Sequence, residues 1–116
     1  MPTTPGPTHI DALVAEHLSA ADRSDLGRSA GIVVHDGELR QTILALTAGT
    51  RLGEHNSPHA ASLYVLQGRV VVTAPSGDVT VEEGEIVTLT HERHAVEAVV
   101  RSAILLTTVT GVPDPS

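Results

Sequence analysis

The sequence predicts an all-β barrel that follows one short α-helix. Beyond residue 29, short runs of aliphatic and β-branched residues recur at close spacing, separated by Gly, Pro and Asp turns. This spacing is typical of an all-β sandwich or barrel. The 116 residues have room for one core, and Tyr64 is the only aromatic residue. Val, Ile, Leu and Ala must therefore fill that core, and β-branched side chains suit a pleated sheet.

The helix is expected over residues 9–22. Thr8 is the expected N-cap, with Asp11 three residues later as a carboxylate variant of the capping box. A helical face predicts that this segment lies on the barrel or on a partner subunit. That face is formed by Ile10, Leu13, Val14, His17, Leu18 and Ala21.

Eight or nine short strands follow, joined by turn signals. Asp36-Gly37 indicates a hairpin, and Pro75–Asp78 indicates a second tight turn. The expected strands are Ala30–Val34, Leu39–Leu46, Arg51–His55, Ser62–Leu66, Arg69–Ala74, Val79–Glu82, Glu85–Leu89, His94–Val99 and Ala103–Val109.

Composition excludes several classes of protein. The absence of Cys excludes disulfides, thiolate metal sites and cysteine nucleophiles. A net charge of −7 and the absence of lysine argue against binding to nucleic acid, which needs a basic face. No apolar run approaches the ~20 residues of a membrane helix. The N-terminus lacks the basic and apolar regions of a signal peptide. We therefore expect a cytoplasmic protein without nucleic-acid or membrane partners.

Two stretches combine a glycine turn, a hydrophobic strand and a histidine. The first runs from Gly49 through His55 to Gly68, and the second runs from Gly84 to His94. They resemble the two motifs of the cupin superfamily. The first cupin motif is a glycine, five residues, His-x-His, three or four residues, Glu, six residues and a glycine. The second is a glycine, five residues, Pro-x-Gly, two residues and a histidine.

The chain departs from these motifs at three positions, and the loop of the second motif, which ends at His94, is one residue shorter. Ser57 occupies the second histidine position, Ala61 the glutamate position, and Thr90 the usual proline position. The resemblance nevertheless covers the chain apart from its tails. It implies an RmlC-like cupin jelly-roll barrel of two antiparallel sheets with one short N-terminal α-helix. Small single-domain cupins of this kind form a group without an established reaction. The expected organisation is a flexible tail over 1–8, one cupin domain over 9–110 with its barrel over about 29–110, and a flexible tail over 111–116.

The resemblance implies a metal site with His55 and His94 as ligands. Each histidine is polar where the alternation of its segment otherwise places an apolar side chain inside the barrel. Imidazole suits zinc, iron, nickel or copper, and manganese is a further possible metal. His59 follows Pro58, and at the barrel mouth it can replace the ligands missing at two motif positions. The alternatives are pocket histidines hydrogen-bonded to a neighbour or to water, and an exposed loop position for His59.

Five further residues, of which Gln41 and Thr42 are alternatives, are candidates for lining the pocket or for contacting the metal ligands. His91 lies in a turn and is a rim residue or a proton shuttle. Gln41 and Thr42 lie on opposite faces of one strand, so one of them must face inward, where it can orient a ligand or water. Ser57 and Tyr64 complete the set, although core packing is the alternative for Tyr64.

The function expected from these residues is binding of a divalent metal, a small molecule, or both, in a His-lined cavity. One alternative is a metal-dependent dioxygenase, isomerase or cyclase with a His-only site. Another is a ligand-sensing module that acts with a separate regulator. No catalytic residue is named, since the chain has no nucleophile turn and no phosphate loop. A homodimer is expected from the apolar helix face and from two aliphatic strands, Ile32–Val34 and Ile104–Leu106.

Overall fold

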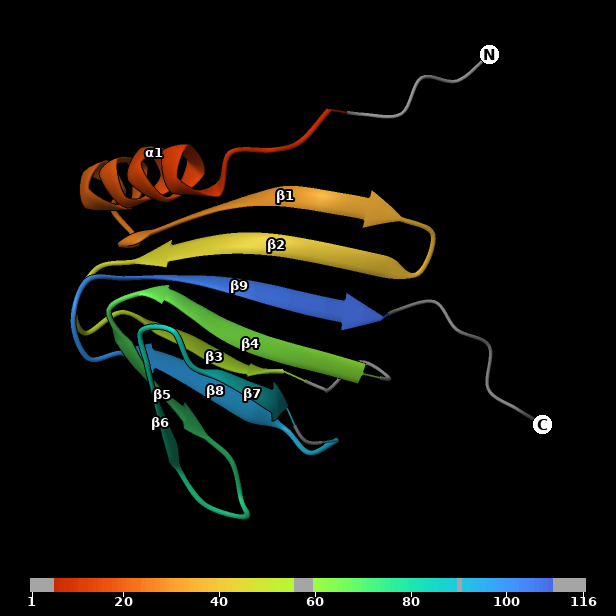
Figure 1. Ribbon diagram of the computed structural model, residues 1–116. Helices are drawn as coiled ribbons and strands as arrows, with labels where there is room; N and C mark the ends of the chain where they lie inside the picture. Colours follow the sequence, from red (N-terminus) through yellow and green to blue (C-terminus); the bar gives the residue numbers. More distant parts are fainter. Residues whose placement is uncertain (1–5, 56–59, 90, 110–116) are drawn as a thin grey trace.

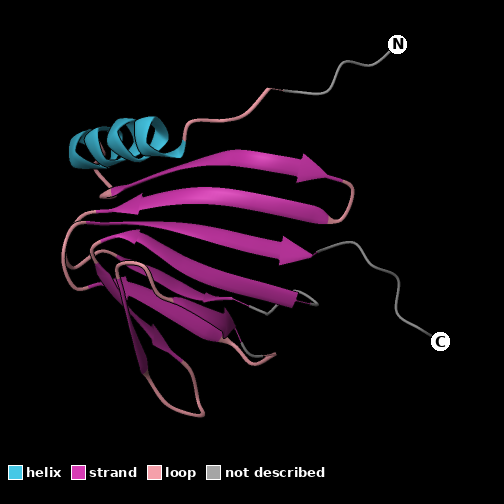
Figure 2. Ribbon diagram, in the orientation of Figure 1, coloured by secondary structure: helices cyan, strands magenta, loops and turns pink. Residues whose placement is uncertain are grey.

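The computed structural model describes residues 6–55, 60–89 and 91–109, with the backbone alone at residues 54 and 55. In these residues one α-helix precedes nine β-strands (Figure 1; Figure 2). The helix and strands are α1 (Ile10–Arg23), β1 (Arg28–Asp36), β2 (Leu39–Leu46), β3 (Arg51–His55), β4 (Ala60–Gln67), β5 (Arg69–Thr73), β6 (Val79–Glu82), β7 (Ile86–Leu89), β8 (His94–Ala98) and β9 (Ser102–Val109). The predicted all-β architecture with one N-terminal helix is confirmed.

The strands form two antiparallel sheets that face each other. One sheet has five strands in the order β1-β2-β9-β4-β7, and the other has four in the order β3-β8-β5-β6. Figure 1 shows α1 lying along β1 and β2, on the outer side of the five-stranded sheet. In the described part of the chain, no helix has the length and apolar character that a membrane span requires.

Two hydrophobic clusters follow from the alternation of the strands. Odd-numbered residues of β4, such as Leu63 and Val65, point between the sheets and pack against Val70, Val81 and Ile104. The other cluster lies between α1 and the outer face of the five-stranded sheet. It is formed by Val14, Leu18, Ala21, Ile43, Ala45 and Ala103. The helix therefore buries its apolar face against its own barrel.

The N-cap of α1 is His9, so the prediction of Thr8 was wrong by one residue. His9 has an extended backbone conformation, and its Nδ1 accepts a hydrogen bond from the Ala12 backbone N–H at 3.4 Å. The helix begins at Ile10, and the residue immediately before the first helical residue is the one whose side chain caps the helix. The expected tail over residues 1–8 is described only at residues 6–8, and the expected tail over residues 111–116 lies outside the described residues.

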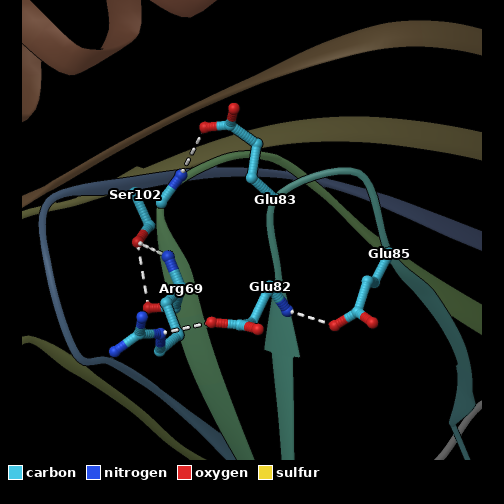
Figure 3. Close-up of polar contacts among 6 residues, drawn as sticks. Arg69, Glu82, Glu83, Glu85 and Ser102 are labelled. Atoms are coloured by element: carbon cyan, nitrogen blue, oxygen red, sulfur yellow. Dashed lines mark hydrogen bonds and ion pairs between the residues drawn. The ribbon is translucent and has the colours of Figure 1, made fainter.

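A close turn at Gly68 joins β4 to β5 at one end of the barrel. The hydroxyl of the buried residue Ser102 accepts a hydrogen bond from the Arg69 backbone N–H at 3.0 Å. Figure 3 shows this contact beside an ion pair between Arg69 Nε and Glu82 Oε1, whose atoms are 3.0 Å apart. The Glu83 carboxylate accepts from the Gly68 N–H at 3.2 Å. Ser102 thus joins the start of β9 to the β4–β5 turn, and Glu83 joins the β6–β7 turn to it.

The opposite end of the barrel collects the strand ends that carry the histidine motifs. There β3, β7 and β9 finish, while β4 and β8 begin. The antiparallel register explains this arrangement, since it pairs His55 with His94 and Ala60 with Val109. This end of the barrel is therefore where the fold places the candidate site.

Candidate functional site

A cavity of about 250 Å³ lies between the two sheets. Both sheets contribute to its wall, through β2, β4, β7 and β9 on one side and β3 and β8 on the other. Its lining residues are Leu44, Leu52, Leu63, Leu89, His94, Val96, Ile104 and Leu106. Among these residues His94 alone is polar, so the cavity is an aliphatic hollow with one imidazole in its wall.

His94 is the first residue of β8, and 7% of its surface is exposed. Its Nδ1 lies 3.1 Å from the backbone carbonyl oxygen of Glu92. A carbonyl oxygen can only accept a hydrogen bond, so Nδ1 carries the hydrogen. In the neutral ring Nε2 is then the unprotonated nitrogen, which is the one that accepts a hydrogen bond or binds a metal.

The backbone register brings the two predicted metal-ligand positions together. His55 is the last residue of β3, and it pairs with His94 across the β3–β8 ladder. Residues that oppose each other in an antiparallel pair occupy the same face of the sheet. The side chain of His55 lies outside the described residues, as do Ser57 and His59. Their predicted roles stay predictions.

The described residues do not make up a complete metal site. Within residues 6–53, 60–89 and 91–109, whose side chains are described, no group of three His, Asp or Glu side chains is placed to hold an ion. Ala61, at the glutamate position of the first cupin motif, is 8% exposed and packs between the sheets. Its methyl group offers no electron pair to a metal. In this part of the chain the donor set is one imidazole, that of His94.

His91 lies apart from the main cavity. It is an exposed residue in the bend before β8. Together with residues from β4, β7 and β9 it lines a second hollow of about 240 Å³ at the same end of the barrel. His91 is not among the residues that line the main cavity. This placement is compatible with the predicted rim position.

Gln41 and Tyr64 lie on the faces of their strands that point away from the cavity. Gln41 shares a face of β2 with Ile43, which packs under α1, and its Nε2 donates to Thr107 Oγ1 at 3.1 Å. Thr42 lies on the same face of β2 as Leu44, which lines the cavity. Tyr64 alternates with the inward-pointing Leu63 of β4. The structure does not bring these two predicted pocket residues to His94.

The sequence gives little indication that the aliphatic residues of the wall belong to the site. A partial signal exists, because Val96 lies two residues after His94 and shares its face. The leucines of β2, β3 and β9 have no such link to the histidine motifs. Only the packing of the two sheets shows which face of each strand they occupy.

No protein-family model matches this chain, and no curated protein matches it by sequence. Solved structures do match it. A conserved protein of unknown function from Streptococcus pyogenes superimposes with a TM-score of 0.69 and 25% identity, over 78% of this chain and 80% of that one. An RmlC-like cupin from Shewanella frigidimarina gives a TM-score of 0.67 and 16% identity, over 74% of this chain and 78% of that one.

A variant of salicylate 1,2-dioxygenase from Pseudoaminobacter salicylatoxidans gives a TM-score of 0.71 and 18% identity, over 86% of this chain and 32% of that one. These likenesses, together with the two sheets, show that the chain has a cupin fold, as its histidine motifs predict. Its fold is that of small RmlC-like cupins, with one N-terminal helix packed on its five-stranded sheet.

Proposed function

We propose that this protein binds a small molecule in the cavity between its sheets, with His94 as the polar anchor. The observation that carries the proposal is a buried imidazole in the wall of an otherwise aliphatic hollow of about 250 Å³. Binding sites for small molecules are commonly apolar hollows in which a few polar groups set the orientation of the ligand.

The chemistry of the wall indicates the kind of molecule. Leucine and valine side chains favour an apolar body, since burying it removes its surface from water. An imidazole protonated at Nδ1 accepts a hydrogen bond at Nε2. The matching ligand is a compact apolar molecule with one hydroxyl group, and a simple phenol is a suitable probe.

Cavity binding is tested with 4-fluorophenol, observed by fluorine NMR. Leu106→Phe places a larger side chain in the cavity, whereas Leu105→Phe makes the same change on the other face of β9. We expect wild type and Leu105→Phe to bind the probe. Leu106→Phe should lose at least about tenfold in affinity, which corresponds to about 1.4 kcal/mol. No binding to wild type, or equal binding to both variants, would overturn the proposal.

The anchoring role of His94 is tested separately with His94→Leu. This change keeps the wall apolar and removes the hydrogen-bond acceptor. We expect wild type to bind 4-fluorophenol more tightly than 4-fluorotoluene, and His94→Leu to lose that preference. A variant that retains the preference for the phenol contradicts the anchoring role.

A divalent metal ion at His94 and His55 is a second candidate function. Two observations favour it: the register pairs these positions, and the His94 Nδ1 donates to a backbone carbonyl, as metal-binding histidines commonly do. His59 is the proposed third ligand, as the sequence predicts. When bound to neutral imidazoles, a divalent ion keeps its full positive charge and acts as a Lewis acid.

The metal content of protein purified without a His-tag tests this candidate, by plasma mass spectrometry. We expect stoichiometric metal in wild type and in His35→Ala, whose exposed histidine lies on β1. His55→Ala and His94→Ala should both lose it. Sub-stoichiometric metal in wild type, unchanged in the two variants, contradicts the metal site. Catalysis of the dioxygenase, isomerase or cyclase type requires this metal, so the measurement precedes any screen for activity.

A further inference from the structure

The loop that leads into His94 is fastened to the β5–β6 hairpin by Glu92. The Glu92 carboxylate accepts a hydrogen bond from the Ser76 backbone N–H at 3.0 Å and another from the Ser76 hydroxyl. Ser76 lies in a tight turn closed by a hydrogen bond from the Gly77 N–H to the Ala74 carbonyl at 2.9 Å. A carboxylate that accepts two hydrogen bonds from one residue holds it in a defined orientation.

The sheet brings these two loops together. The four-stranded sheet places β5 beside β8 and pairs Thr73 with Ala95. The turn after β5 and the loop before β8 therefore lie at the same end of adjacent strands. The hairpin also lies against the cavity wall, because Leu89 lines both the cavity and a smaller void of about 60 Å³ beneath the hairpin.

The same residue, Glu92, also orients His94. Its backbone carbonyl accepts the hydrogen of His94 Nδ1 at 3.1 Å. Glu92 therefore contacts the hairpin through its side chain and the imidazole through its main chain. A neutral imidazole has two tautomers, and the hydrogen bond made by one nitrogen decides the protonation of the other.

We propose that Glu92 is a positioning residue for His94, and that its contact with Ser76 holds the His94 ring in the tautomer with the hydrogen on Nδ1. This inference rests on the proposed function in so far as His94 is the polar anchor of the cavity. The contact between carboxylate and hairpin keeps the carbonyl of Glu92 in place. That carbonyl keeps Nδ1 protonated, so Nε2 remains the acceptor.

The test measures the tautomer of His94 directly. The ring nitrogen shifts of the uniformly nitrogen-15-labelled protein are recorded by long-range proton–nitrogen correlation at alkaline pH, where imidazole is neutral. The His94 signals are assigned by their loss in His94→Leu. Three variants are compared with wild type: Glu92→Ala removes the carboxylate, Glu92→Gln keeps an acceptor and a donor for Ser76, and Ser76→Ala removes only the hydroxyl.

Glu83→Ala is the matched control. Glu83 is an exposed glutamate whose carboxylate, like that of the half-buried Glu92, accepts from a backbone N–H in a turn, that of Gly68, at the other end of the barrel. We expect wild type, Glu92→Gln and Glu83→Ala to show a protonated Nδ1. Glu92→Ala should populate the Nε2-protonated tautomer, and Ser76→Ala should shift the equilibrium in the same direction by a smaller amount.

An Nδ1-protonated ring in Glu92→Ala and Ser76→Ala would overturn the positioning role. We also expect Glu92→Ala to weaken 4-fluorophenol binding about tenfold, and Glu92→Gln to preserve it. The two proposals fail separately. Wild type without affinity for the probe overturns the binding function, while the tautomer of the variants still decides the role of Glu92.

Discussion

Gly68, at the turn between β4 and β5, has a backbone φ of +94°. Residues with a β-carbon rarely adopt this conformation. A β-carbon at this position would also meet the backbone oxygen of Arg101 at 2.7 Å and the α-carbon of Ser102 at 2.9 Å. Backbone atoms cannot swing aside as a flexible side chain does. This glycine closes the first cupin motif because the β8–β9 turn lies directly against it.

Replacing Gly68 with alanine should therefore destabilise the protein more than a positive φ alone explains. Gly49 is the matched control, because its φ is +83° and a β-carbon added there would meet no described atom within 4 Å. We expect Gly49→Ala to lose about 1–2 kcal/mol in the free energy of unfolding. Gly68→Ala should lose about 3 kcal/mol or more, because overpacking adds to the strain. Urea denaturation measures both, and equal losses contradict the close packing.

At the scale of the element, α1 is joined to the barrel by apolar packing and by an ion pair. Asp22, in its last turn, accepts hydrogen bonds from Arg101 in the β8–β9 turn, with Nη2 and Oδ2 2.7 Å apart. Hydrogen bonding to this guanidinium lowers the pKa of Asp22 below its ordinary value of 3.8, and hydrogen bonding to the carboxylate raises the pKa of Arg101. Both side chains are exposed, so solvent screens the pair.

The lowered pKa gives this contact a defined dependence on pH. A carboxyl group with a folded-state pKa below its unfolded value stabilises the protein above the unfolded value, and the contribution is lost as pH falls through the folded value. We expect Asp22→Asn to be less stable than wild type at neutral pH, and the difference to disappear as the pH falls below 3.8 and through the lowered pKa. Thermal denaturation across this range measures it.

Asp25→Asn is the control for that measurement. Asp25 is also an exposed aspartate, and it follows the helix in the turn before β1. We expect its substitution to leave the pH profile of stability close to that of wild type. A loss in Asp22→Asn that persists unchanged into acid contradicts the role of the ion pair.

At the scale of the whole molecule, packing within a single copy of the chain buries most of the surfaces from which the homodimer was predicted. Leu18 of the helix packs against the five-stranded sheet, and Ile104 of β9 lies in the core between the sheets. Ile32 of β1 is different, since 63% of its surface is exposed on a strand at the edge of its sheet. The expected homodimer therefore depends on β1.

Pairing of two copies of β1 is also compatible with charge. Arg28 and Asp36 lie at equal distances in sequence on either side of Ile32. An antiparallel pair of strands centred on Ile32 would place each arginine opposite the aspartate of the second copy, and opposite charges across strands are favourable. An unpaired edge strand has free backbone donors and acceptors for such a partner.

We expect wild type to be a dimer in gel filtration with light scattering, and Ile32→Glu to be a monomer. Ile86→Glu is the control, because Ile86 is 62% exposed on β7, at the other edge of the same sheet. It should remain a dimer. A wild type that is monomeric at micromolar concentration contradicts the homodimer, and a monomeric Ile86→Glu contradicts the assignment to β1.

The sequence by itself determined the helix, the strands and the cupin motifs. Local patterns carry that information: a helical apolar face, alternation along strands, and glycine turns such as those at Gly37 and Gly68. The resemblance at His55 and His94 then predicted a site where the strands that carry these two histidines meet. These features depend on residues that are close in the sequence.

Only the tertiary structure decided which polar residues face the cavity. Alternation gives every strand two faces, and contact with the second sheet selects one of them. That contact places His94 in the wall and Gln41 and Tyr64 away from it. The contact between Ser76 and Glu92 also depends on tertiary structure, here on strand pairing within one sheet. The two residues are sixteen positions apart in the sequence, and the pairing of β5 with β8 brings their loops together.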